Sequence, residues 1–165
     1  MSNLPFKTFF EVLSVMLVEA YDGPPDPRST WFIDNEPDCG ILGTVKHINA
    51  QQASISMDGK MSAGSTIASH VEHLRWALMN VNNAIRGELY QPVWKESWLV
   101  TEVTGQAWDD LRAALHSEYL TMMDLINNQT GLEGGELYGA MALAPHAAFH
   151  LGILRQMIER VNQGE

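Results

Sequence analysis

Two histidines spaced four residues apart are the residues in this sequence best placed to do chemistry. His146 and His150 lie in an apolar stretch near the end of the chain. If that stretch is helical, the two side chains project from one face, roughly one turn (about 6 Å) apart. Buried imidazoles need partners for both ring nitrogens, because an unpaired buried polar group costs about 1–3 kcal/mol. A metal ion would supply one partner to each ring; the alternative is a pair of core histidines bonded to the backbone or to each other.

A third imidazole can come from the segment Ser69-His70-Val71-Glu72-His73, which holds two candidates. On a helical wheel His70 lies nearer the centre of the apolar stripe, and His73 lies toward its edge. Periodicity alone therefore favours His70, but a neighbouring helix can reach either flank, so both stay open at this point. Glu72 could serve as an outer base beside such a site, or it could be a solvated helix-flank carboxylate.

Four segments with helical periodicity must position these side chains. They run from Phe6 to Ala20, from about Thr66 to Gly87, from about Thr104 to about Gly131, and from about Leu137 to Asn162. Gly131 and the Gly134-Gly135 pair are expected to end the third helix. Ser65 or Thr66 is the expected N-cap of the second helix. Pro145 inside the fourth pattern predicts either a kink or a helix that starts at the proline.

Two long connections separate these helices. The first follows the breaker Asp22-Gly23-Pro24-Pro25 and extends to about Ser65, with a short helical turn expected near 49–54. Its apolar residues favour an ordered loop that packs on the bundle: Trp31, Phe32, Ile41, Leu42 and Val45. The second spans 88–103, and its Trp94 and Trp98, like Trp31 and Trp108, are expected to pack in loops or core. The sequence thus predicts one all-α domain over 1–165, a four-helix bundle with long ordered loops.

Composition restricts the partners of this chain. Its 165 residues are 45% hydrophobic and 18% charged, with a formal net charge of −10. This charge disfavours binding to nucleic acid or to anionic lipid. The charges of Lys7, Glu11 and Glu19 make the first segment an ordinary amphipathic helix, and no targeting or transmembrane segment is expected. The single cysteine, Cys39, predicts a reducing, cytoplasmic setting and is also a possible nucleophile or soft ligand. His47 and His116 are expected to be solvated or to make local hydrogen bonds.

Two motifs together resemble the DinB-like (DinB/YfiT) superfamily of metal-binding four-helix bundles. The first is Thr66-Ile67 with His73 six residues after the isoleucine and just before an apolar residue; the second is His146-x-x-x-His150-x-Gly152. The resemblance implies that His73, His146 and His150 are the metal ligands and that His70 is a core residue or supports the ligands. Gly152 is then expected to let a neighbouring helix approach closely. This chain departs from many relatives by carrying Ile153 in place of glutamine and by its long first loop.

Three neutral imidazoles suit Zn²⁺ or Ni²⁺ and leave positions for water or substrate. Such a metal can lower the pKa of bound water to about 7 or bind a thiol as thiolate. The resemblance implies a metal-dependent transferase, isomerase or hydrolase acting on a small molecule, with a low-molecular-weight thiol as the favoured reactant, and a homodimer. The alternative is a non-enzymatic, stress-associated bundle whose metal is structural or which binds a small ligand. No catalytic residue beyond the ligands is assigned.

Overall fold

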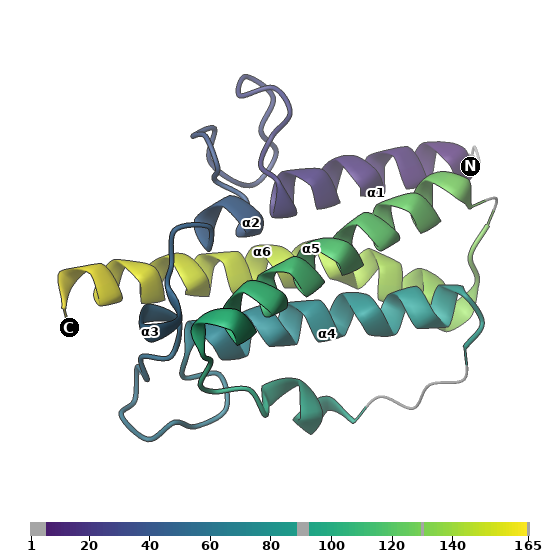
Figure 1. The fold of residues 1–165 in the computed structure, drawn as a ribbon. Helices are drawn as coiled ribbons and strands as arrows, with labels where there is room; N and C mark the ends of the chain where they lie inside the picture. The colour runs from purple at the N-terminus through teal and green to yellow at the C-terminus, as the bar shows by residue number, and fades with distance from the viewer. Residues whose placement is uncertain (1–5, 89–92, 130, 165) are drawn as a thin grey trace.

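Four long helices dominate the computed structural model, which describes residues 6–88, 93–129 and 131–164 (Figure 1). They are α1 (Phe6–Tyr21), α4 (Ile67–Ile85), α5 (Gly105–Asn128) and α6 (Gly134–Gln163). Two short helices, α2 (Ile41–Thr44) and α3 (Ala50–Ala53), and a 3₁₀ turn, η1 (Trp94–Trp98), lie in the connections. No strand occurs in the described ranges. The predicted all-α class is confirmed.

The long helices pack side by side, as the predicted bundle requires. Helices α4 and α1 each contact both α5 and α6, which gives the order α1, α5, α4, α6 around the bundle. The apolar residues of α5 that recur every three to four positions form one buried stripe: Trp108, Leu111, Leu115, Tyr119, Met122 and Ile126. The Trp108 indole N–H also donates to the Ile48 carbonyl at 2.6 Å, which ties α5 to the first long loop.

The helix starts follow local capping chemistry. The Thr66 hydroxyl accepts a hydrogen bond from the Ser69 amide at 3.1 Å, and Thr66 is the N-cap of α4 as expected. The N-cap of α5 is Thr104, and the third helix was predicted to run from about this residue. The predicted turn near 49–54 is α3, closed by a reciprocal capping box between Asn49 and Gln52.

The last helix differs from its prediction in two respects. It begins at Gly134, so the Gly134-Gly135 pair opens α6 and does not end α5, which stops at Asn128. It also runs through Pro145 without a break, so the prediction of a helix starting at that proline is wrong. Proline removes an N–H from the helix, and the carbonyl that loses its partner belongs to Met141, four residues earlier. Both residues are exposed, so water can hydrate that carbonyl.

The same helix bears on the question of a membrane. Within the described ranges, α6 alone is long and apolar enough to cross a bilayer by length and composition. The core helix of a soluble protein passes the same test, and α6 packs against α1, α2 and α4.

The first long loop is ordered on the bundle, as its apolar residues predict. Ile41, Val45 and Ile48 are buried in the core. Trp31 and Phe32 are exceptions, because 72% and 37% of their surfaces are exposed. Around Trp31, the backbone N–H groups of the loop attach it to the bundle.

A buried carboxylate anchors this segment to α1. Glu19 is 1% exposed, and its Oε1 accepts hydrogen bonds from the backbone N–H groups of Trp31, Phe32 and Ile33 at 2.7, 2.9 and 3.1 Å. Hydrogen bonds to a charged group are each worth about 1.5–3 kcal/mol. Glu19 therefore satisfies three donors of a loop that no regular ladder supports.

Replacing Glu19 by alanine should lower the free energy of unfolding by about 3 kcal/mol, since three N–H groups lose their acceptor. Urea unfolding followed by circular dichroism measures this. The matched control is Glu11→Ala on the same helix, where the side chain is 62% exposed and the expected change is within about 0.5 kcal/mol. Equal losses for the two variants would mean that Glu19 does not anchor the loop.

Candidate metal centre

Helices α4 and α6 bring three imidazoles together in the interior of the bundle. His73 and His150 are buried and His146 is half-buried, and one ring nitrogen from each lies within 4.8 Å of the others. The Nε2 atoms of His73 and His146 are 3.0 Å apart. The three residues expected to share a cation thus lie close enough to do so.

His70 lies beside this group, but both of its nitrogens already have partners. Its Nε2 is 3.0 Å from the Gly64 carbonyl oxygen, and its Nδ1 is 2.9 Å from Nδ1 of His150. A carbonyl can only accept, so His70 carries its proton on Nε2 and accepts at Nδ1. His150 must then donate from Nδ1, which leaves its Nε2 lone pair free to bind a cation.

A second hydrogen-bond chain sets the proton on His73 in the same way. The Ser97 hydroxyl donates to the Trp94 carbonyl at 2.7 Å and accepts from His73 Nδ1 at 2.7 Å. His73 Nε2 therefore has no proton, and in the 3.0 Å contact His146 Nε2 is the donor. A cation held by these two atoms would take the place of that proton.

Burial keeps the cluster neutral. Desolvation, reinforced by the neighbouring imidazoles, lowers the pKa of His150 to about 3 and that of His73 to about 4. The pKa values of His70 and His146 are lowered as well, mainly by burial. Neutral imidazole is the form that binds metals. At pH 7 these rings are already neutral, so no proton has to leave a charged imidazolium before a metal binds.

The spacing suits a small divalent ion. Zn–N bonds of 2.0–2.1 Å in tetrahedral geometry place ligand nitrogens about 3.3 Å apart. The His73–His146 separation of 3.0 Å is already close to that value. The widest pair, at no more than 4.8 Å, needs to close by at most about 1.5 Å (4.8 minus 3.3), which side-chain rotation can supply.

The 3₁₀ turn η1 forms one wall of the cluster. The Trp98 ring stacks on His73 with centroids 3.9 Å apart and meets His70 edge-on at 5.4 Å. Ser97, fully buried, comes from the same turn. This turn and the role of Ser97 were not predicted, because a five-residue 3₁₀ turn has no periodicity to detect. The expectation that tryptophans pack holds for Trp98 and for core Trp108, whereas Trp94 is 56% exposed.

The other residues considered from the sequence lie outside this cluster. Arg75 holds Glu72 in a two-pronged ion pair with both distances at 2.7 Å, so Glu72 is not an unencumbered base. Cys39 is buried, donates from Sγ to the Asp34 carbonyl at 3.0 Å, and has its pKa raised by burial. Its thiol is therefore a poor nucleophile. His47 and His116 are exposed, as expected.

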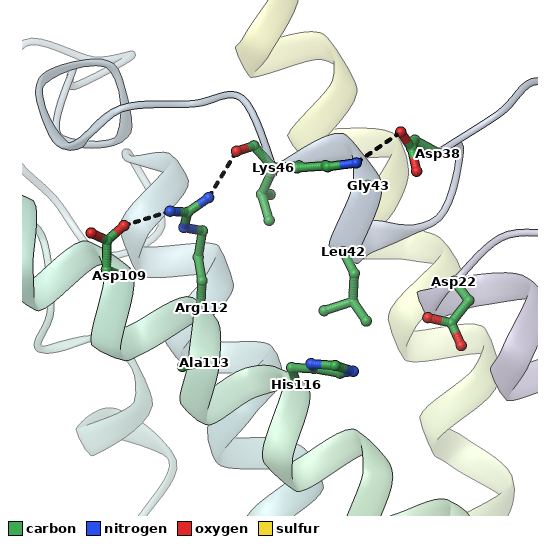
Figure 2. Close-up of a pocket in the computed structure, with 10 residues that line it drawn as sticks. Asp22, Asp38, Leu42, Gly43, Lys46, Asp109, Arg112, Ala113 and His116 are labelled. Carbon is green, nitrogen blue, oxygen red and sulfur yellow. Dashed lines mark hydrogen bonds and ion pairs between the residues drawn. The ribbon is translucent and has the colours of Figure 1, made fainter.

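His116 borders a hollow between α2 and α5 that Figure 2 shows. The two basic groups that line this hollow are paired with carboxylates. Lys46 meets Asp38 at 3.4 Å, and Arg112 meets Asp109 at 2.5 Å. The remaining carboxylate, Asp22, accepts a hydrogen bond from the Tyr119 hydroxyl at 2.6 Å, so every Asp, Lys and Arg that lines the hollow has a partner within the protein.

The proton arrangement predicts that His70 supports the site without binding the metal. Replacing His70 by leucine leaves His150 Nδ1 without an acceptor and should weaken Zn²⁺ binding about 10- to 100-fold, the usual cost of losing an outer partner of a ligand. Competition with a fluorescent zinc chelator measures the affinity, and circular dichroism checks the fold. The control, His47→Leu, should bind normally. Complete loss of Zn²⁺ binding in a folded His70→Leu protein would make His70 a ligand.

The chain was compared with protein-family models, with curated proteins and with solved structures. The chain matches no family model, no curated protein and no solved structure. The resemblance to DinB-like proteins accordingly stands on the two sequence motifs, and the function has to be argued from the geometry of the histidines.

Proposed function

We propose that this protein binds a divalent metal through His73, His146 and His150 and uses it to activate a small thiol for transfer to an electrophile. The observation that carries the proposal is the direction of the two hydrogen-bond chains. They start at the carbonyls of Gly64 and Trp94 and leave Nε2 of His150 and His73 without protons beside His146. These are the atoms a cation needs.

The charge of the site favours an anionic reactant. Three neutral ligands leave the ion its full double positive charge, and the adjacent carboxylate, Glu72, is already neutralised by Arg75. A thiolate or hydroxide is the natural further ligand of such an ion. In the proposed reaction the thiol loses its proton to solvent, its sulfur bonds to the electrophilic carbon, and the leaving group departs with the electrons of its bond.

The broader assignment follows from the same features. A four-helix arrangement with histidines at 73, 146 and 150 is what a DinB-like protein would have, so we retain that family as a proposal. Zn²⁺ or Ni²⁺ is the proposed metal, because both favour imidazole ligands. The reactant is proposed to be a low-molecular-weight thiol. Cytoplasmic location and a homodimer remain predictions.

The alternative, a metal that only stabilises the fold, is less well supported by the hydrogen bonding. The imidazoles of His70, His73 and His150 already have partners in the protein, and the bundle core is continuous around them. Structural zinc sites usually have four protein ligands. Here three residues form the group identified within the described chain. Folding should therefore not depend on the ion.

Elemental analysis of untagged protein tests the metal site. Alanine at position 73, 146 or 150 should reduce bound metal from about one equivalent to near zero, because each change removes one of three ligands. The controls His47→Ala and His116→Ala remove exposed histidines and should keep the metal. Thermal unfolding of the metal-free protein should remain cooperative. Metal removal that unfolds the chain would support the structural role instead.

Adduct formation tests the reaction. The metal-loaded protein, incubated with 1-chloro-2,4-dinitrobenzene and a panel of cellular thiols, should form the thioether and release chloride faster than a blank. His146→Ala should abolish the enhancement because it removes a ligand, whereas His116→Ala should not affect it. If metal binds but no thiol reacts faster than the blank, the transferase proposal fails while the metal site stands.

A further inference from the structure

A second hollow lies along the outer side of the C-terminal half of α6. Its volume is about 460 Å³, within the range of small-molecule sites. Met57, Phe149, Ile153 and Met157 give it apolar walls, and Arg160 stands at its border. Phe149 is 65% exposed, so the face of its ring is open to a ligand in the hollow.

Gly152 in the middle of α6 helps to keep this hollow open. A glycine in a helix interior costs about 1 kcal/mol relative to alanine. The sequence suggested that close packing of a neighbouring helix would justify it, but that expectation is wrong: a Cβ at Gly152 would meet nothing within 4 Å. Gly152 instead lines the hollow, and any larger side chain there would project into it.

Arg160 gives the hollow a charge preference. Its guanidinium has no ion pair among those found in the described part of the chain, although the protein carries a formal net charge of −10. The other residues lining the hollow are uncharged. In the hollow of Figure 2, by contrast, the basic groups are paired with neighbouring carboxylates. An unpaired cation beside an apolar wall is complementary to an organic anion.

Two residues that line the hollow, Gly64 and Phe149, also contact the histidine cluster. The Gly64 carbonyl accepts the hydrogen bond from His70, and Gly64 also lines the hollow. The Phe149 ring lies edge-on to His150 with centroids 5.1 Å apart. From His150 to Arg160 the helix rises about 15 Å, so an apolar body of several carbons fits between the cluster and the guanidinium.

We propose that this hollow binds small organic anions that have an apolar body, with the carboxylate or sulfonate held by Arg160. The apolar body lies on the two methionines and Phe149, over the space that Gly152 leaves. Binding does not require a metal at the histidines. The proposal therefore stands or falls separately from the thiol chemistry.

Titration of the full chain with octanoate tests the proposal, using 1-octanol as the matched neutral ligand. Carbon-13-labelled methionine methyl groups are followed by NMR, because Met57 and Met157 line the hollow. Octanoate should shift these two resonances and bind about tenfold more tightly than 1-octanol, as expected for one charge-assisted contact. Octanoate shifts confined to other methionines, or equal affinity for both ligands, would overturn the proposal.

Two substitutions separate the contributions. Arg160→Gln should weaken octanoate binding about tenfold and leave 1-octanol binding unchanged. The control Arg86→Gln removes a charge at the C-cap of α4 and should change neither. Gly152→Leu should block both ligands while preserving the helix, since leucine is a better helix former than glycine. Unaltered octanoate binding in Arg160→Gln, or in a folded Gly152→Leu protein, would refute the assigned site.

Adding Zn²⁺ provides the last check. Octanoate should bind with similar affinity with and without the metal, because its carboxylate meets Arg160. Binding that appears only with Zn²⁺ would mean that the carboxylate is a metal ligand, and the hollow would not be an anion site of its own.

Discussion

Two backbone carbonyl groups determine where the protons lie on four clustered imidazoles. A carbonyl oxygen cannot donate, so the oxygen atoms of Gly64 and Trp94 force every hydrogen bond behind them to point the same way. At the far end of each chain a ring nitrogen carries no proton: Nε2 of His150, and Nε2 of His73, which accepts from His146. The cluster's capacity to hold a cation thus originates in main-chain groups and a serine, and the histidines alone do not explain it.

These carbonyls are useful only because the segments that carry them are fixed. Gly64 has a φ of +74°, and a Cβ there would lie 3.2 Å from the Trp98 ring, so both conformation and crowding call for glycine. Just after it, Thr66 caps α4. The Ser69 hydroxyl then donates to the Val100 carbonyl at 2.7 Å, which attaches the segment following η1 to the same end of α4. The segment that carries Gly64 and the segment that follows η1 are therefore both held at the N-terminal end of α4.

Periodicity predicted the parts of the fold that depend on burial of one helix face. All six stripe residues of α5 are buried, because apolar residues that repeat every three to four positions share one helix face. Thr66 is a predicted cap, and α5 begins where the pattern predicted, because both signals are local. The grouping of the histidines at 146 and 150 followed from spacing alone. His73 was chosen over His70 only by family resemblance, since a wheel measures position on one helix and not the reach of its neighbours.

The remaining features could not be predicted because they depend on non-local contacts or on the backbone. The role of Ser97 arises where a 3₁₀ turn meets α4, and the carbonyl of Gly64 leaves no mark on the sequence. From the sequence, Glu19 is one charge of an amphipathic helix. Its role as acceptor for three N–H groups of a distant loop depends on tertiary contacts that the sequence pattern does not show. Gly152 was misread because glycine has the same signature whether a helix or a cavity lies against it.

The position of Gly64 has a consequence for communication within the protein. This residue borders the hollow along α6 and also supplies the carbonyl that orients His70, so it is part of both the hollow and the histidine cluster. A molecule that displaces the Gly64 carbonyl would change the basicity of His150 through His70. Thermodynamic linkage makes such coupling reciprocal: whatever an occupant of the hollow does to cation affinity, the cation does equally to the affinity of that occupant.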